Sequence, residues 1–385
     1  MLEEYIYHGK QRLRCGYTTG SCASAAAKAA AQMLLTGECV RRVELLTPKG
    51  IMIAPDILDS TFDSNFACCA VQKDSGDDPD ITNGILIYAR AEKIPHGIEI
   101  DGGEGIGRVT ARGLDQPVGA AAINSVPRRM ITAVVEEICE TYDYRGGMKI
   151  TVFVPNGAEI AKKTYNPRMG IEGGISIIGT TGIVEPMSNA ALIETIRTEE
   201  RMRRAEGKQN LLLTIGNYSK SFLAREMPFL LDKSVTCSNF IGEAIDAALE
   251  YGFERILLIG HIGKLVKLGA GIMNTHSAQA DGRMDVLVTC AVLAGANGTD
   301  LEEIRKIPEC VTVDAALEIL ESIVMKEKTA AILMERAQSY LEAKVKGGAE
   351  IGAVMFSDKF GIIGQTATAA GLIQKITEEY GENHG

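Results

Sequence analysis

Three glycine-containing loops, each directly after a short apolar run, carry the side chains of this sequence best suited to chemistry. They read Gly179-Thr-Thr-Gly182, Gly216-Asn-Tyr-Ser219 and Gly260-His-Ile-Gly-Lys264. Glycine lets the backbone approach a ligand closely, and the hydroxyl, amide and imidazole groups add hydrogen bonds. A glycine that merely ends a strand is the alternative for each loop alone, but three similar loops favour a site. We predict cofactor contacts from Gly179, Thr180, Thr181, Gly182, Gly216, Asn217, Gly260 and Gly263.

A dense polar segment continues from the third of these loops. It contains His261, Lys264, Lys267 and His276. His261 directly follows an apolar run, at the edge of a sheet where ligands bind, so we predict that it is catalytic and either orients the substrate or accepts a proton. The alternative is a structural role, which a single histidine has more often. Lys264, Lys267 and His276 are predicted to bind substrate, the lysines through carboxylates.

Two earlier segments carry groups that bind anions. Thr18 and Thr19 precede an Ala-rich stretch, residues 21–35. This stretch is predicted to form a helix with Ser21 as its N-cap. Hydroxyls and free amides at such a helix start can hold a phosphate, although an ordinary capped helix has the same sequence. Arg128 and Arg129 follow a proline and can pair with carboxylates. We predict substrate contacts from all four side chains.

Asp101 is an acidic residue of the glycine-rich stretch Ile98-Glu-Ile-Asp-Gly-Gly-Glu-Gly-Ile-Gly107. Many enzymes that use S-adenosylmethionine hold it with an acid and glycines in a similar loop, which makes Asp101 a candidate catalytic residue. A helix should follow such a loop, but Gly113 and Pro117 argue against one. A tight turn is therefore the alternative.

Several functions are disfavoured by what the sequence lacks. No loop has the Walker spacing and GxGxxG does not occur, which disfavours ATP hydrolysis and dinucleotide binding. The formal net charge of -10 gives no broad positive field for nucleic acid or an anionic membrane. Neither the histidines nor the 9 cysteines have zinc-site spacing, so no metal site is predicted, and the absence of CxxC fits reduced thiols in a cytosol. The N-terminus does not resemble a secretion signal and no apolar run could span a membrane, so we predict a cytoplasmic protein.

The apolar pattern predicts two domains of different class. A chain of 385 residues exceeds the size at which one core usually keeps growing. Residues 1–168 mix helices with short strands around an acidic loop, which indicates an α+β domain. Residues 169–385 alternate apolar runs with amphipathic helices, which indicates a Rossmann-like, three-layer α/β domain with a mostly parallel sheet. Strands are predicted at 43–47, 66–72, 85–91, 175–178, 211–215, 255–259 and 351–356, and helices at 21–35, 129–142, 189–204, 241–251 and between 284 and 346.

In their order along the chain, the motifs resemble those of the CbiD family, the cobalt-precorrin-5B C(1)-methyltransferases of anaerobic cobalamin biosynthesis. The resemblance covers most of the chain and departs from the family pattern at Asn83, where histidine is expected, and at Ser125, where proline is expected. The matching motifs are Gly16-Tyr-Thr-Thr-Gly-Ser-Cys-Ala23, Lys73-Asp-Ser-Gly-Asp-Asp-Pro-Asp80, Gly105-Ile-Gly-Arg-Val-Thr110, Gly173-Gly-Ile-Ser-Ile-Ile-Gly-Thr-Thr-Gly182, Val184-Glu-Pro-Met187, and Gly260-His-Ile-Gly-Lys264 through Thr275-His-Ser277.

This resemblance implies an enzyme that methylates ring carbon C-1 of cobalt-precorrin-5B to give cobalt-precorrin-6A, with S-adenosylmethionine as methyl donor. Cobalt would arrive with the corrinoid substrate, and alignment of donor and ring carbon should supply much of the rate. Two alternatives stay open: a small-molecule kinase that uses residues 18–31 for phosphate, and a non-catalytic corrinoid carrier. The sequence also leaves open a homo-oligomer and transient contacts with neighbouring pathway enzymes.

Overall fold

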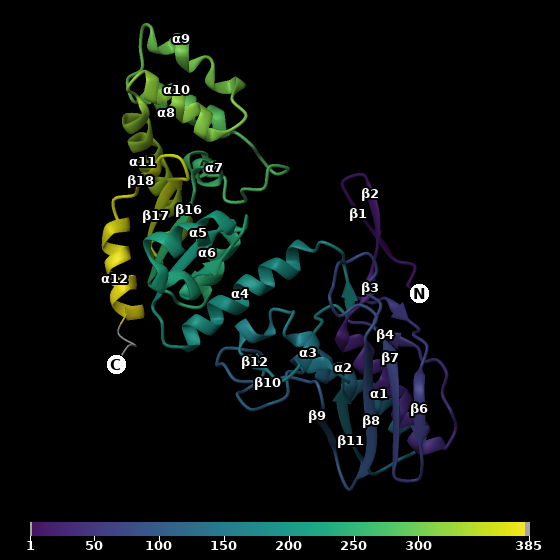
Figure 1. The fold of residues 1–385 in the computed structure, drawn as a ribbon. Helices are drawn as coiled ribbons and strands as arrows, with labels where there is room; N and C mark the ends of the chain where they lie inside the picture. The colour runs from purple at the N-terminus through teal and green to yellow at the C-terminus, as the bar shows by residue number, and fades with distance from the viewer. Residues whose placement is uncertain (1, 382–385) are drawn as a thin grey trace. The chain divides into compact units, whose positions relative to one another are not determined.

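The chain folds into two compact units. The computed structural model describes residues 2–381, and the units are Met1–Ser188 and Asn189–Gly385 (Figure 1). The division predicted after residue 168 lies too early. Residues 169–188 belong to the first unit because their backbone pairs with it: Ile171 pairs with Val109, and Ile183 pairs with Tyr17.

The first unit is built on a five-stranded sheet of order β6-β7-β8-β11-β9, in which only β9 and β11 pair in parallel. The strands are β6 (Leu58–Phe62), β7 (Phe66–Gln72), β8 (Leu86–Ile94), β9 (Ile98–Gly102) and β11 (Gly147–Phe153). Strand β7 spans the predicted residues 66–72. The strand predicted at 43–47 is reduced to β4 (Leu45–Leu46). A mostly antiparallel sheet with helices confirms the α+β class of this part of the chain.

Four short strand pairs complete the first unit. They are β1 (Tyr5–His8) with β2 (Gln11–Arg14), β3 (Gly16–Tyr17) with β13 (Ile183–Val184), β4 with β5 (Met52–Ile53), and β10 (Arg108–Val109) with β12 (Ile171–Glu172). Helix α3 (Gly157–Ala161) and the 3₁₀ turn η1 (Asn166–Met169) connect β11 to β12. The strand predicted at 175–178 is wrong, because these residues form only isolated bridges, Ile175 with Ile106 and Ile177 with Ile123.

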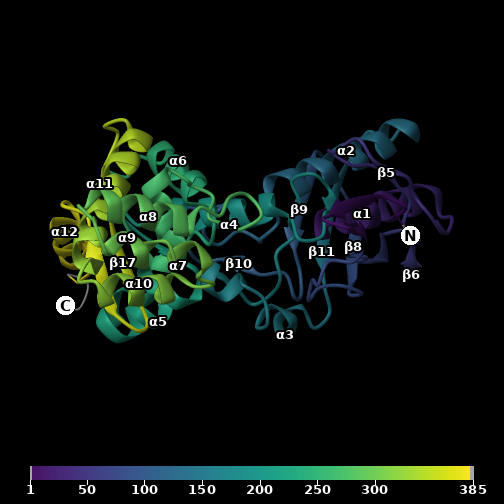
Figure 2. The same ribbon diagram turned by 90° about the horizontal axis from the view of Figure 1, so that it is seen from above.

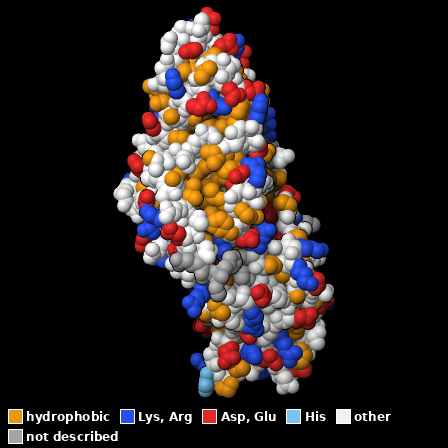
Figure 3. Space-filling view, turned by 60° about the vertical axis from the view of Figure 1, so that its left-hand side comes forward, with side chains coloured by type: hydrophobic (Ala, Val, Ile, Leu, Met, Phe, Trp, Pro, Cys, Tyr) orange, Lys and Arg blue, Asp and Glu red, His pale blue; other side chains and the backbone are white. Residues whose placement is uncertain are grey.

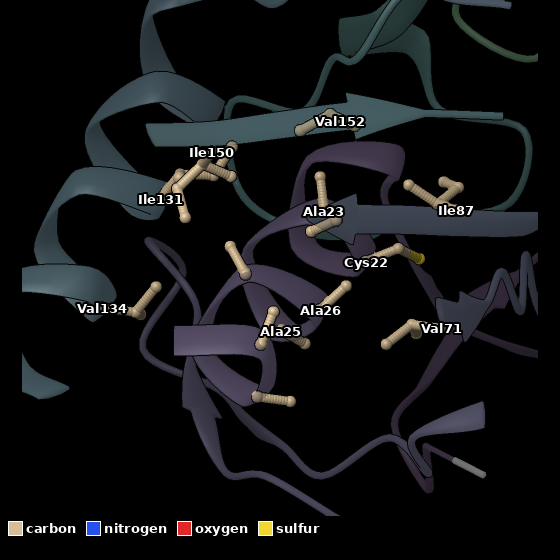
Figure 4. Close-up of a cluster of buried hydrophobic side chains, with 14 of the residues drawn as sticks. Cys22, Ala23, Ala25, Ala26, Val71, Ile87, Ile131, Val134, Ile150 and Val152 are labelled. Atoms are coloured by element: carbon tan, nitrogen blue, oxygen red, sulfur yellow. The ribbon is translucent and has the colours of Figure 1, made fainter. Parts of the chain in front are cut away.

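The Ala-rich helix α1 (Thr19–Thr36) forms the centre of the first unit's core. It packs against α2 (Ser125–Thr141) and against β7 and β8 (Figure 4). Small side chains let the helix approach both neighbours closely, so its alanines are fully buried. Its cap is Thr18, whose hydroxyl accepts a hydrogen bond from the Ser21 amide, and not the predicted serine.

The second unit contains a five-stranded sheet of order β15-β14-β16-β17-β18, in which only β18 is antiparallel. The strands are β14 (Asn210–Ile215), β15 (Val235–Thr236), β16 (Arg255–His261), β17 (Glu350–Ser357) and β18 (Gly361–Gln365). Successive side chains of a strand point to opposite faces. Leu211 and Leu213 therefore lie in one core and Leu212 in another. This confirms the predicted three-layer, mostly parallel architecture.

Helices cover both faces of this sheet. Helix α11 lies on one face and α12 on the other (Figures 1 and 2). Their side chains belong to two separate hydrophobic cores. The helices are α4 (Asn189–Ala205), α5 (Gly216–Glu226), α6 (Ile241–Glu250), α7 (Ile262–Leu265), α8 (Arg283–Leu293), α9 (Asp300–Ile304), α10 (Val313–Ser322), α11 (Lys326–Val345) and α12 (Ala369–Gly381), with 3₁₀ turns η2 (Pro228–Lys233), η3 (Val266–Ala270) and η4 (Ile307–Glu309).

Acidic and basic side chains are interspersed over the face shown in Figure 3. Among residues 2–381, no helix is both long and apolar enough to cross a membrane.

Candidate functional site

The strand order of the second unit defines where a ligand can enter. In the sheet, β14 has β15 on one side and β16 on the other. The chain therefore leaves β14 toward one edge of the sheet and leaves β16 toward the opposite edge, so the gap between β14 and β16 is the point where its direction reverses. In open sheets of this order, ligands bind at that gap, beyond the carboxyl ends of the strands. Ile215 pairs with Gly260 there, so the start of α5 at Gly216 and the end of β16 at His261 lie side by side. Two of the three predicted loops thus meet at one edge.

His261 is fixed at this edge by its own chain. Its Nδ1 atom accepts a hydrogen bond from the Gly263 amide at 3.1 Å, which caps α7. Its ring lies edge-on to Phe356, with centroids 5.6 Å apart, and is tilted against Tyr218 at 5.3 Å. An imidazole whose Nδ1 accepts a hydrogen bond carries its proton on Nε2 when neutral. In this tautomer His261 presents an Nε2–H donor, an arrangement that suits orientation of a ligand better than acceptance of a proton.

Lys264 is a half-buried cation with no internal partner. Its ammonium makes no hydrogen bond or ion pair within residues 2–381, and burial lowers its pKa. The nitrogen lies 3.5 Å from the position that a Cβ on Gly216 would occupy. Gly216 has φ +75°, a conformation that favours glycine. The Lys264 ammonium, which has no counter-charge among the described residues, therefore lies next to backbone without a side chain at the edge of the sheet.

Lys267 has a different role from the predicted one. Its side chain is buried, and its ammonium donates to the carbonyl oxygens of Ala280 at 2.6 Å and Thr275 at 3.1 Å. The Thr275 hydroxyl in turn donates to the Asn239 side chain at 3.2 Å. Lys267 thus anchors the loop that carries His276 next to the end of β15, and we assign it a positioning role instead of substrate contact.

The remaining predicted residues of this edge divide into packing and exposed positions. A Cβ on Gly260 would lie 2.9 Å from the Leu265 side chain and 3.0 Å from that of Ile215, so this glycine serves packing. Gly263 supplies the amide that holds His261. Asn217 and His276 are exposed, and the His276 Nδ1 atom accepts from the Ala278 amide at 3.2 Å.

The loop from Gly179 to Gly182 belongs to the first unit and does not follow a strand of the second unit's sheet, contrary to prediction. It closes over the start of α1 in the first unit, where a Cβ on Gly179 would lie 2.2 Å from the Thr18 hydroxyl. The Thr18 amide donates a hydrogen bond to the Gly182 carbonyl oxygen at 3.1 Å, and the Ser21 hydroxyl donates to the same oxygen at 2.7 Å. The Thr19 hydroxyl accepts from the Ile178 amide at 2.8 Å. The predicted phosphate site is therefore filled by the protein's own loop.

The threonines of this loop have separate environments. Thr181 bonds locally, its hydroxyl donating to the Ile183 carbonyl at 3.0 Å. Thr180 is exposed and lines a cavity of about 350 Å³ together with Arg129. The cavity wall is otherwise mainly apolar, with Leu45, Leu46, Pro48, Val126, Met130, Ala133 and Val134. Thr180 and Arg129 are the two predicted residues that the first unit brings together at an open surface.

Arg128 and Asp101 are engaged within the fold. The Arg128 guanidinium donates to the carbonyl oxygens of Ile123 at 2.8 Å, Ile100 at 2.9 Å and Ala121 at 3.4 Å. Asp101 pairs with Arg108 at 2.8 Å, and this hydrogen bond lowers the pKa of the carboxyl. Instead of the predicted substrate and catalytic roles, we assign both to the local structure, Arg128 as a carbonyl clamp and Asp101 as half of an exposed ion pair.

The acidic loop after β7 is also satisfied internally. Arg14 makes two hydrogen bonds to Asp74, at 2.6 and 2.7 Å, and Lys73 is buried against Asp80 at 2.6 Å. These pairs neutralise Asp74 and Asp80, two of the four carboxylates of the loop. Among the described residues, no three His, Cys, Asp or Glu side chains are grouped so as to hold a metal ion.

One buried carboxyl group was not predicted from the sequence. Glu200 of α4 is fully buried, and neither of its oxygens has a hydrogen-bond partner in the described structure. Burial raises its pKa to about 9, so it is protonated at neutral pH. It shares a helix face with Ile193 and Ile196, which pack into the core. That spacing of three and four residues was the available signal.

Known proteins and family models match this chain over most of its length. The family model described as CbiD matches residues 6–186, which is nearly all of the first unit, and the model of the CbiD C-terminal domain matches residues 274–367. A cobalt-precorrin-5B C(1)-methyltransferase of Ruminiclostridium cellulolyticum is 47% identical over 93% of this chain and 92% of its own length. The chain belongs to the CbiD family.

Other relatives of this CbiD protein agree. A cobalt-precorrin-5B C(1)-methyltransferase of Alkaliphilus metalliredigens is 40% identical over 98% of this chain and 99% of its own length. A crystal structure described as a cobalamin biosynthesis protein (cbiD) from Archaeoglobus fulgidus is 30% identical over 72% of this chain and 86% of its own, with a TM-score of 0.38.

Proposed function

We propose that this CbiD protein transfers a methyl group from S-adenosylmethionine to C-1 of cobalt-precorrin-5B in cobalamin biosynthesis. The observation that carries the proposal is the 47% identity, over 93% of the chain, to a relative named for that reaction. The free groups at the carboxyl edge of the second unit's sheet support a ligand site there. Cobalt is part of the substrate, so the protein's own residues need only bind and align the two reactants.

The residues at the sheet edge suit alignment better than proton transfer. Methyl transfer needs the sulfonium, the methyl group and the ring carbon in line, which fixed geometry can provide. His261 is held as a hydrogen-bond donor, Lys264 supplies an unpaired positive charge, and Gly216 leaves room for a ligand to reach the backbone. Tyr218, 63% exposed, adds an aromatic surface beside His261. We place the donor at this edge, with contacts from Gly216, Asn217 and Gly263.

The first unit offers a second surface to the acceptor. The cavity of about 350 Å³ lined by Arg129 and Thr180 is mostly apolar with one exposed guanidinium. A corrinoid edge presents apolar ring substituents and carboxylates, which match such a lining. We infer that this surface binds a carboxylate-bearing part of the corrinoid through Arg129 and Thr180.

An anaerobic assay tests the proposed reaction. The full-length protein is mixed with methyl-labelled S-adenosylmethionine and cobalt-precorrin-5B, and mass spectrometry follows the corrinoid. We expect one added labelled methyl group, located at C-1 by NMR. Corrinoid binding without methyl transfer would favour a carrier. Binding of Mg-ATP without binding of S-adenosylhomocysteine would favour a kinase, for which the closed start of α1 leaves no phosphate site.

A further inference from the structure

Two lysines at the same sheet edge have opposite surroundings. Lys267 is buried, and its ammonium donates to two carbonyl oxygens, with Asp281 at 4.0 Å. Lys264, one turn earlier, has no hydrogen bond or ion pair within residues 2–381. The described structure therefore provides hydrogen-bond acceptors for the ammonium of Lys267, which anchors a loop, and none for the ammonium of Lys264.

No anionic group of the described chain compensates Lys264. The groups that influence its pKa are the Cys237 thiol and the Lys267 ammonium, and neither is a carboxylate. Cys237 is fully buried, and burial raises its pKa to about 12, so the thiol is neutral at physiological pH. Holding a half-buried cation without a counter-charge destabilises the folded protein. Such a group persists where a ligand supplies the missing charge.

His261 adds a second unsatisfied donor beside this charge. Its Nδ1 atom is occupied by the Gly263 amide, and its Nε2 atom has no partner in residues 2–381. Both side chains border the segment from Gly216 to Tyr218: Lys264 lies over Gly216, and the His261 ring contacts that of Tyr218. An ammonium and an imidazole N–H next to backbone without a side chain are suited to an oxygen anion.

We propose that Lys264 and His261 form a carboxylate-binding subsite at the gap between β14 and β16. The ammonium supplies charge and the Nε2–H supplies a directed hydrogen bond. The identity of the carboxylate rests on the proposed function, because both reactants of that reaction carry carboxylates: the amino-acid end of the donor, and the side chains of the corrinoid. The existence of the subsite does not depend on which one binds.

The first experiment needs no assumption about the reaction. Lys264→Met removes the charge and keeps a long apolar stem. Lys328→Met removes the same charge at an exposed lysine of α11 that has no ion pair within residues 2–381. Thermal unfolding is followed in sodium acetate and in sodium chloride at equal ionic strength. We expect acetate to raise the Tm of the wild type and of Lys328→Met, but not that of Lys264→Met.

Stability without ligand separates a binding role from a structural one. Removing an uncompensated charge should leave the Tm of Lys264→Met in chloride equal to or above that of the wild type. A lower Tm, together with full stabilisation of the variant by acetate, would overturn the proposal. Absence of any acetate effect on the wild type would overturn it too.

The second experiment identifies the source of the carboxylate. Calorimetry compares S-adenosylhomocysteine with its analogue lacking the α-carboxylate, and cobyrinic acid with its heptamethyl ester. Lys264→Met should weaken binding of one free acid by about tenfold to a hundredfold, and leave binding of the matching analogue without free carboxylates unaffected. Unchanged affinity for both acids would overturn the proposal. If acetate stabilises the protein through Lys264 but neither acid binds, the subsite stands and the proposed function fails.

Discussion

The Nδ1 atom of His261 accepts a hydrogen bond from the backbone amide of Gly263 at 3.1 Å, and this contact determines which chemistry the imidazole can do. The neutral ring can therefore donate through Nε2 while its Nδ1 atom accepts the hydrogen bond that caps α7.

The tautomer of His261 is directly measurable. We expect ¹⁵N NMR of the imidazole to report a proton on Nε2 and none on Nδ1 at pH 7. His261→Asn should preserve the fold, because asparagine is a good helix cap. It should lower turnover by less than the roughly 10²–10⁴-fold expected for a general base and leave the pH profile unchanged. A proton on Nδ1, or the loss of one limb of the profile, would restore the base mechanism.

Loss of the Lys267 ammonium should free the loop that it anchors. Lys267→Met leaves the carbonyls of Thr275 and Ala280 without their donor, and we expect a loss of about 2 kcal/mol in the free energy of unfolding. Hydrogen exchange should accelerate in residues 275–281 before it does in β16. Lys328→Met is the control, and it should change neither quantity. Unaltered protection of the loop would show that other contacts hold it.

Glu200 should make stability fall as the pH rises. Its pKa is raised from 4.5 to about 9 in the folded state, so between these values the native protein binds a proton that the unfolded chain has released. Ionisation of the unfolded chain therefore favours unfolding increasingly from pH 4.5 upward, by about 3 kcal/mol at pH 7. Glu200→Gln cannot ionise, so its unfolding free energy in urea should lose this slope.

The matched control for this titration is the exposed Glu194 of the same helix. Glu194→Gln should keep the pH dependence of the wild type. Parallel stability curves for the wild type and Glu200→Gln between pH 5 and 8.5 would mean that the Glu200 carboxyl finds a partner or solvent in solution.

Adjacent arginines of α2 should behave differently. Arg128 donates to three carbonyl oxygens, whereas Arg129 is exposed beside the cavity of the first unit. Arg128→Met should lower the free energy of unfolding by about 2 kcal/mol, and Arg129→Met should change it by less than about 0.5 kcal/mol. Denaturant titration measures both. Under the proposed function Arg129→Met should instead weaken corrinoid binding, and equal stability losses would contradict the assignment.

The sequence predicted those elements whose signal is local. Residues 66–72 and 211–215 are apolar runs bounded by polar segments, and both are strands. Residues 175–178 give the same local signal, yet their partners are Ile106 and Ile123, which no local pattern specifies. Membership of a domain depends on such distant pairing, so the boundary could not be read from composition.

The site could be predicted only to the level of the loop. The position of His261 after a buried strand placed it correctly at a sheet edge. Lys264 and Lys267 are one turn apart and look equivalent in the sequence, but one meets carbonyl oxygens and the other meets none. Glycines at 179 and 182 indicated close backbone approach, and the partner is the protein's own helix start. Only tertiary contacts distinguish these cases.

Because the loop at residues 179–182 closes over the start of α1, the first unit can complete its fold only late in synthesis. Thr18 pairs with Gly182 and Tyr17 with Ile183, so the first strands and first helix of the chain are completed by some of the last residues of their unit. A nascent chain cannot make these contacts until the ribosome has released residue 183 or so, and contacts this distant in sequence form slowly. Until then, the helix that forms the centre of the core has an open N-terminus, and the unit has to emerge almost whole before it can fold.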